Sequence, residues 1–194
     1  MTNFIVPDGY KLLPTLKELL FTFLKPKIFG EELPLVYGFS DVDLYSVHPR
    51  ELFNVDMHSN EEDDETHRYV FTQLKKKNYK GEKYNRRIDE VGTWRGEFNN
   101  EIEDEHGNII GYDKYFKFVA EEKGKGKEKE KEKDDNCKVE YTMHEYSFAP
   151  NYDHDQLLPR QPNEDIVLCR IAKKLIKGNR RATNKRGRGV ICMR

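Results

Sequence analysis

The chain has 194 residues, of which 36% are hydrophobic and another 36% are charged, with a formal net charge of -1. Its mean hydropathy of -0.92 is low for a globular protein, which predicts one domain with sizeable solvated segments. The apolar run "LLFTFL" is too short to cross a bilayer, and the first ten residues lack a signal-peptide pattern. The sequence is therefore typical of a soluble intracellular protein without a membrane partner.

The cysteines and histidines do not form a recognisable reactive site. Cys137, Cys169 and Cys192 are far apart and form no Cys-x-x-Cys pair, so we expect reduced thiols and neither a disulfide framework nor a zinc site. His144 and Glu145 are neighbours on a predicted strand and therefore point to opposite faces, which suits neither a catalytic dyad nor a metal pair. We expect no metal, no cofactor and no enzymatic activity.

The first predicted element is a helix in "PTLKELLFTFLKPK". Its apolar residues recur at helical spacing along one face, and these are Leu16, Leu19, Leu20, Phe23 and Leu24. Thr15 and Glu18 have the spacing of a capping box, in which each side chain satisfies a free backbone amide of the other. Pro26 is predicted to end the helix because proline cannot donate a backbone hydrogen bond.

From residue 66 onward the apolar residues alternate with polar ones, which is typical of strands with one buried face. Five segments show the pattern: "HRYVFTQL", "EVGTWRGEF", "YDKYFKFVA", "EYTMHEYSF" and "DIVLCRIAK". A short helical turn is predicted around "HPREL". One helix followed by a mostly antiparallel sheet predicts an α+β domain.

Three segments depart from this pattern. Residues 54–65 form an acidic stretch predicted as a loop, and residues 121–135 alternate Lys with Glu and Gly, which predicts a disordered insertion. The chain carries no Asp or Glu after Arg170, so residues 175–194 form a basic tail. This tail is either a nuclear-import signal, a nucleic-acid contact or an unselected solvated terminus.

Four short strings, taken in order, resemble the NAC domain of plant transcription factors. They are "VPDGYKLLPTLKEL", "DVDLY", "MHEYSF" and "VLCRIAKK", and the resemblance runs from about Val6 to Lys174. It implies that residues 1–174 form a twisted antiparallel sheet packed between the amino-terminal helix and short helical elements. It also implies a nuclear protein that dimerises, with itself or another family member, and binds double-stranded DNA through one sheet edge.

The resemblance places the dimer interface at Gly9, Tyr10, Lys11 and Glu18. In the family an arginine at the position of Lys11 pairs with the glutamate at the position of Glu18 on the other subunit. Lysine is a point charge and cannot make the bidentate fork that arginine makes with a carboxylate, so we expect a weaker pair. The alternative is that Lys11 is an ordinary surface residue and Glu18 serves only its own helix cap.

The DNA-binding residues implied by the resemblance begin in "KKKNYKGEKYNRR", residues 75–87, where seven cations accompany one acid. Cations of this kind neutralise phosphates and release counterions. The expected contacts are Lys76, Lys77, Arg86, Arg87, Arg95 and Lys114. Leu74 stands where the family usually has an arginine, and Asp113 replaces a family lysine.

The strand with the sequence "WRGEF" should enter the major groove, yet it differs from the family's tryptophan-lysine-alanine-threonine-glycine. We expect Trp94 to be buried and Arg95, on the opposite face, to be free for contact. Glu97 and Phe98 introduce a negative charge and bulk, and acidic residues follow at 101, 103, 104 and 105.

Two functions therefore follow from the sequence. The first is a sequence-specific DNA-binding regulator, and the second is an interaction protein that keeps the fold but reads DNA poorly and titrates other family members into heterodimers. The short chain after Lys174 also leads us to expect no autonomous activation region.

Overall fold

The structure, a computed structural model, describes residues 13–34, 39–53, 65–78, 83–121, 137–150, 152 and 165–177. The acidic stretch at 54–64, the Lys/Glu segment after Glu121 and the tail after Lys177 lie outside the described residues. No helix among the described residues is both long and apolar enough to span a membrane.

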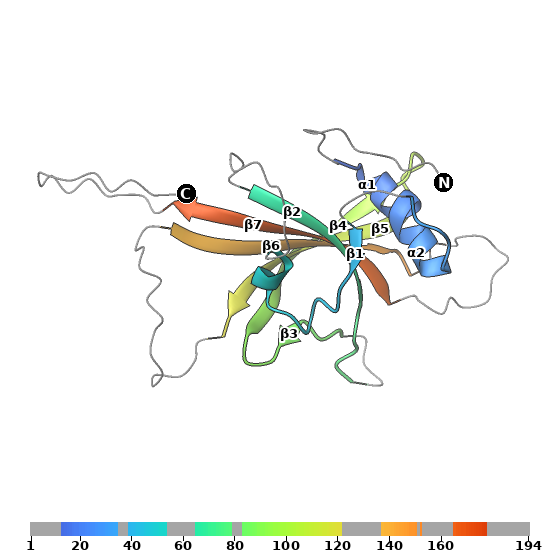
Figure 1. The fold of residues 1–194 in the computed structure, drawn as a ribbon. Coiled ribbons are helices and arrows are strands. Elements are labelled where there is room, and N and C mark those ends of the chain that lie inside the picture. Colours follow the sequence, from blue (N-terminus) through green and yellow to red (C-terminus); the bar gives the residue numbers. More distant parts are fainter. Residues whose placement is uncertain are drawn as a thin grey trace, which may run out of the picture.

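Seven strands form one strongly twisted sheet in the order β1-β2-β7-β6-β5-β4-β3 (Figure 1). The strands are β1 (Phe39–Asp41), β2 (Glu65–Gln73), β3 (Arg87–Ile88), β4 (Gly92–Glu103), β5 (Ile109–Ala120), β6 (Cys137–Phe148) and β7 (Ile166–Lys177). All neighbours pair antiparallel except β1, which runs parallel to β2. The five long strands confirm the five predicted ones. β1 and β3 were missed because two or three residues are too short to show an alternating pattern.

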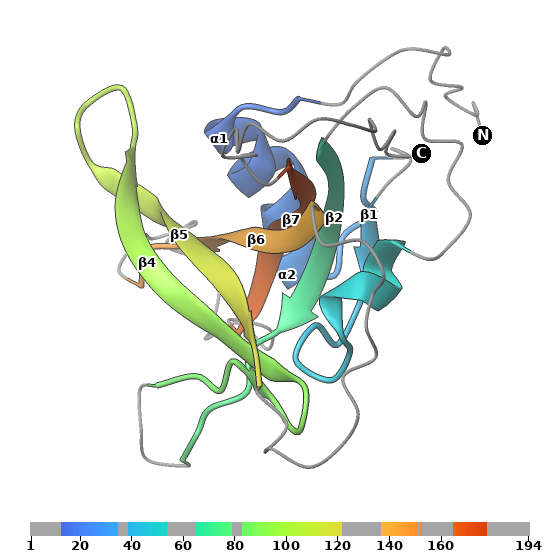
Figure 2. The same ribbon diagram turned by 90° about the vertical axis from the view of Figure 1, so that its left-hand side faces the viewer.

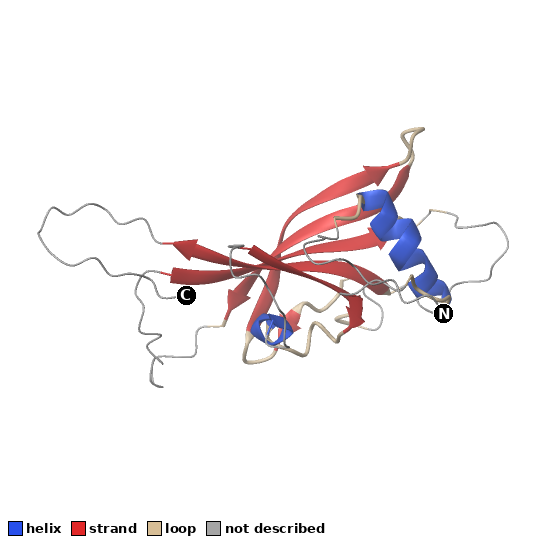
Figure 3. Ribbon diagram, turned by 45° about the horizontal axis from the view of Figure 1, so that its top comes forward, coloured by secondary structure: helices blue, strands red, loops and turns tan. Residues whose placement is uncertain are grey.

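The predicted amino-terminal helix is present as one continuous rod (Figure 3), made of α1 (Leu16–Glu18), the π-helical turn η1 (Leu19–Leu24) and α2 (Lys25–Phe29). The capping box is confirmed: the Glu18 amide donates to Thr15 Oγ1 at 3.3 Å, and the Thr15 amide donates to Glu18 Oε2 at 2.7 Å. These two bonds satisfy backbone donors that the first helical turn leaves free.

The prediction that Pro26 ends the helix is wrong. Pro26 lies in the first turn of α2, and the helix continues to Phe29 before Gly30 ends it in the left-handed conformation, with φ 73°. In the π-helical turn before it, the amide of Lys25 bonds to the carbonyl of Leu20, five residues back. This wider turn changes the carbonyl positions with which a proline ring would clash in a regular α-helix.

Two hydrophobic cores lie on the opposite faces of the sheet, because successive residues of each strand point to opposite sides. The helix covers one face, where its residues Leu20 and Leu24 pack with Phe71, Tyr146 and Leu168. The other face is covered by residues 42–53, which include the 3-10 helix η2 (Pro49–Phe53) predicted around "HPREL". Its core comprises Leu44, Tyr45, Leu52, Val70, Leu74, Trp94, Phe116, Tyr141, Met143, Val167, Cys169 and Ile171. The α+β fold, with a twisted sheet between helical elements, is therefore confirmed.

The helix packs closely against the sheet at Gly111 on β5. A Cβ atom added there would lie 2.6 Å from the carbonyl oxygen of Ser147 and 2.8 Å from Leu20 Cδ1. The backbone oxygen belongs to the neighbouring strand and cannot move aside without disturbing the sheet. Gly111 therefore sets the distance between β5 and the helix.

We predict that Gly111→Ala lowers the free energy of unfolding by about 1 to 3 kcal/mol, because the added methyl group overpacks this contact. The control is Gly96→Ala on β4, where the nearest atom to an added Cβ is 3.4 Å away on the Phe116 ring. Urea denaturation of both variants checks the prediction. Equal stability of the two variants would show that the helix yields easily at Gly111.

Candidate nucleic-acid interface

A buried ion pair fixes the segment that leads into β4. The guanidinium of Arg86 donates from Nη2 to Glu145 Oε1 at 2.7 Å and from Nε to Oε2 at 3.2 Å. The Glu145 side chain on β6 is 0% exposed, and the Arg86 side chain is 17% exposed. The hydroxyl of Tyr45 donates to Glu145 Oε2 at 3.0 Å. The chain segment after β1 and the segment before β3 therefore meet at one carboxylate.

Aromatic rings complete the surroundings of this ion pair. The Arg86 guanidinium lies 4.7 Å from the centre of the Phe116 ring, within the range of a cation–π interaction. Burial acts to lower the pKa of Arg86, but the charge of Glu145 and its hydrogen bonds raise the pKa above its ordinary value. Arg86 is therefore held as a permanent cation inside the protein.

The same segment has two further attachments. The Tyr84 hydroxyl donates to Asp165 Oδ1 at 2.8 Å, and burial together with this bond raises the pKa of Tyr84 to about 12. The carbonyl of Arg86 accepts from the Trp94 amide at 3.0 Å. Since β3 also pairs with β4 at Gly92 and Thr93, the chain carrying the basic residues is fastened to the β4 end of the sheet.

Lys76 and Lys77 are exposed on this fastened segment. Lys76 forms an isolated bridge with Tyr84, and the Lys77 amide donates to the carbonyl of Lys83 at 2.8 Å. These backbone contacts hold residues 76–77 beside residues 83–84, and Figure 2 shows this segment near the start of β4, at the end of the strand away from the β4–β5 turn. Both amino groups are available to solvent, as the DNA-binding prediction requires.

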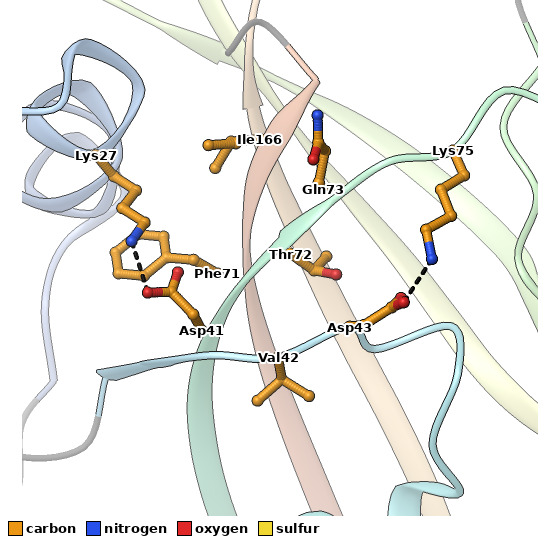
Figure 4. A pocket seen from close by; sticks show the side chains of 9 residues that line it. All are labelled: Lys27, Asp41, Val42, Asp43, Phe71, Thr72, Gln73, Lys75 and Ile166. Carbon is orange, nitrogen blue, oxygen red and sulfur yellow. Dashed lines mark hydrogen bonds and ion pairs between the residues drawn. The ribbon is translucent and has the colours of Figure 1, made fainter.

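The neighbouring Lys75 differs from Lys76 and Lys77 because it already forms an ion pair. It pairs with Asp43 at one side of a pocket of about 410 Å³, and Lys27 pairs with Asp41 at the other side at 2.7 Å (Figure 4). The pocket lies between the helix, β1, β2 and β7, and the Phe71 ring forms part of its wall. The two ion pairs connect β1 and the residue pair after it to the helix and to the start of the basic segment. Because each aspartate already has a lysine partner, we assign both pairs a structural role.

Arg87 is also exposed, but acidic side chains surround it. Its guanidinium lies 2.8 Å from Glu121 and 3.6 Å from Asp89, and its side chain is 54% exposed. Exposed pairs of this kind contribute little to stability and exchange readily with other anions. Arg87 can therefore reach a phosphate only in competition with two carboxylates.

The β4 strand confirms the predicted division between its two faces. Trp94 is 2% exposed and packs edge-on against Phe118, whereas Arg95 on the opposite face is exposed. The register places Arg95 directly opposite Lys117 on β5. Two like charges on adjacent strands disfavour the sheet unless an anion or a counter-charge offsets them. Glu140 lies 3.9 Å from Lys117 and offsets part of this repulsion.

Lys117 was missed by the sequence prediction, because only the strand register shows which residue lies opposite Arg95. Lys114, which was predicted, is half-buried on the other face of β5, with its amino group 5.8 Å from the centre of the Tyr112 ring. Arg95 and Lys114 therefore lie on different faces of the sheet.

Glu97 marks a bulge in β4. The pairing shifts between Gly96 and Phe98, so Glu97 has no partner on β5. In the described part of the chain β3 pairs with β4 only at its first two residues, so β4 forms an open sheet edge beyond them. Bulges and charged side chains protect such edges from pairing with other strands.

Asp113, which replaces a family lysine, is largely removed from the surface. Asp113 is 8% exposed, and its Oδ1 atom lies 2.8 Å from His144 Nδ1. A carboxylate that is buried and paired in this way presents little charge to a phosphate. The adjacent His144 and Glu145 point to opposite faces as predicted, and each contacts a different side chain, Asp113 for His144 and Arg86 for Glu145.

Of the four residues predicted at the dimer interface, only Glu18 lies in the described part of the chain. Glu18 belongs to the capping box, and its exposed carboxylate accepts two bonds from Thr15. Gly9, Tyr10 and Lys11 lie outside the described residues.

Burial raises the pKa of the free Cys169 thiol well above its usual value, which favours an unreactive thiol there. No group of three metal-ligating side chains occurs among the described residues.

We predict that Arg86→Ala lowers the free energy of unfolding by about 3 kcal/mol or more, because it leaves Glu145 charged and unpaired in the core. Replacing both partners, with Arg86→Met and Glu145→Leu, should recover most of the loss. Arg87→Ala, which removes an exposed arginine, is the control and should cost about 0.5 kcal/mol or less. A small loss in Arg86→Ala, measured by urea denaturation, would contradict the anchoring role.

Comparison with known proteins identifies the family. The family model described as "No apical meristem (NAM) protein" matches residues 7–148. NAC domain-containing protein 72 of Arabidopsis thaliana is 29% identical over 180 residues, covering 91% of this chain and 53% of the relative. NAC domain-containing protein 37 of the same plant is 29% identical over 183 residues, covering 94% and 45%. The chain thus spans about half the length of these relatives, and it belongs to the NAC family, whose members are generally transcription factors.

Proposed function

We propose that this protein is a transcriptional regulator that binds double-stranded DNA through the β4 edge of its sheet and acts in the nucleus. The observation that carries the proposal is the opposed pair Arg95 and Lys117, two cations on the exposed face beside an open edge strand. Lys76 and Lys77 add positive charge on the segment that Arg86 fastens next to this edge. Together they offer phosphate contacts from a rigid support.

Arg86 is left out of the proposed contacts. Its guanidinium donates to both oxygens of Glu145, so approaching a phosphate would expose a buried carboxylate without its partner. We assign Arg86 a positioning role instead. The proposed contact residues are Arg95, Lys117, Lys76 and Lys77, with Arg87 as a weaker contributor because of Glu121 and Asp89.

The alternative function is an interaction protein that reads DNA poorly and pairs with other family members. Glu97, Glu101 and Glu103 are all exposed on β4, which favours this alternative. Asp113 no longer supports it, because its charge is buried against His144. The chemistry of the edge is thus mixed, with cations near Arg95 and acids toward the β4–β5 turn.

Fluorescence anisotropy with a labelled duplex carrying the family's core site, beside a scrambled duplex, tests the proposal at two salt concentrations. A preference of tenfold or more for the core site, about 1.4 kcal/mol, is expected for a DNA-reading regulator. Equal affinity for both duplexes that disappears with salt would support the alternative instead, since phosphate contacts alone carry no sequence information.

We predict that Arg95→Ala weakens binding to the core-site duplex by about 1 to 3 kcal/mol if the guanidinium reads a base. The control is Arg50→Ala, which removes an exposed cation from η2. In the opposite direction, Glu97→Thr should strengthen binding, because it removes a negative charge from the DNA-facing edge. Unchanged affinity in Glu97→Thr would contradict the proposed repulsion.

We also propose that the protein forms a dimer through residues 9–11 and the exposed carboxylate of Glu18 on a second subunit. Lys11→Arg should tighten the dimer, because a guanidinium can donate two parallel hydrogen bonds to that carboxylate. Sedimentation equilibrium measures the dissociation constant, with Lys17→Arg on the same helix as the control. A monomer at tens of micromolar in both variants would exclude this interface.

A further inference from the structure

A row of aromatic rings crosses three adjacent strands. It lies on the same face of the sheet as the amino-terminal helix. Phe98 on β4, Tyr115 on β5 and His144 on β6 are direct cross-strand partners. The Phe98 and Tyr115 rings are stacked, with centroids 4.7 Å apart and an interplanar angle of 11°. The His144 ring contacts Tyr115 edge-on at 5.0 Å and stacks with Tyr146 at 6.1 Å. The row thus leads from the buried core to the open edge of the sheet.

The inner end of this row is fixed. Tyr146 is 2% exposed, and the His144 ring is held by Asp113 at 2.8 Å. Tyr115 packs between His144 and Phe98, so few of its rotamers remain open. A ligand that bound here would meet rings already ordered, which lowers the entropic cost of binding.

The outer end of the row is exposed. The Phe98 side chain is 48% exposed, although it lies in the middle of β4. One side of the ring stacks on Tyr115 of β5, and in the described part of the chain no strand pairs with the opposite edge of β4 at Phe98. A flat group of similar size could therefore extend the stack outward.

Two cations, Arg95 and Lys117, lie on the same face of the sheet as Phe98 and Tyr115, at the next cross-strand pair on that face. The bulge at Glu97 keeps Arg95 and Phe98 on one side of β4, and alternation places Lys117 on the side of Tyr115. Two residues along a strand span about 7 Å. Two acids on this face already have partners: Asp113 contacts His144 at 2.8 Å, and Glu140 lies 3.9 Å from Lys117.

From these observations we propose that the surface formed by Phe98, Tyr115, Arg95 and Lys117 binds single-stranded nucleic acid. An unpaired base stacks on the outward side of the Phe98 ring, and the adjoining phosphates contact Arg95 and Lys117. Sheet faces that combine exposed aromatic rings with cations bind single strands in this way, because every base offers a flat face for stacking. In a duplex those base faces are covered by their neighbours, so this activity is separate from the duplex binding proposed above.

The test measures binding of labelled ten-nucleotide oligothymidylate, oligouridylate and a mixed-sequence duplex by fluorescence anisotropy at low salt. We expect Phe98→Ala to weaken single-strand binding at least fivefold, in line with the loss of one stacked base. Phe98→Tyr should restore it, and Ile109→Ala, which shortens another exposed apolar side chain, should leave it unchanged. Because Phe98 is exposed, circular dichroism should show that these variants fold normally.

The outcomes separate the two proposals. Binding of either single strand that depends on Phe98 supports the inference, and the stronger of the two identifies DNA or RNA as the source of the bases. Equal binding by the parent protein and Phe98→Ala, or no single-strand binding at all, overturns it. Duplex binding that persists in Phe98→Ala leaves the proposed function as a transcriptional regulator intact. Single-strand binding without duplex binding would overturn that proposed function but not the single-strand proposal.

Discussion

The buried pair between Arg86 and Glu145 is the interaction on which the arrangement of the candidate interface depends. It joins β6, at the centre of the sheet, to the chain that leads from the basic segment into β4. Because a buried carboxylate without its partner is costly, this segment cannot leave the sheet without a large loss of stability. Tyr45 adds the chain after β1 to the same carboxylate. The exposed Lys76 and Lys77 are thus held in position by the ion pair between Arg86 and Glu145, although neither lysine takes part in it.

The twist and alternation of the sheet let two neighbouring residues organise its two faces. Glu145 fastens the basic segment on one face, while His144 supports the aromatic row on the other. Both faces meet at β4, whose bulge at Glu97 separates the buried Trp94 from the exposed Phe98. The edge strand therefore displays both charge and aromatic surface, supported from behind by the core.

Much of the fold was predictable, because alternation and helical spacing over eight or more residues report directly on burial. The capping box of Thr15 and Glu18 and the burial of Trp94 also followed from local rules. The site was harder to predict, since it depends on register and on contacts between distant segments. Nothing in the sequence near Arg86 indicates a partner 59 residues later, nor does the sequence show that Lys117 lies opposite Arg95.

We propose that Arg86 positions the candidate DNA-binding surface without touching DNA. The most direct test replaces the whole buried cluster by apolar residues, with Arg86→Met, Glu145→Leu and Tyr45→Phe together, and measures duplex affinity over a range of salt concentrations. If Arg86 acts only as an anchor, the slope of log affinity against log salt should match that of the parent protein. A slope smaller in magnitude by about 0.9, the value for one neutralised phosphate, would show that Arg86 contacts the DNA itself and contradict the claim.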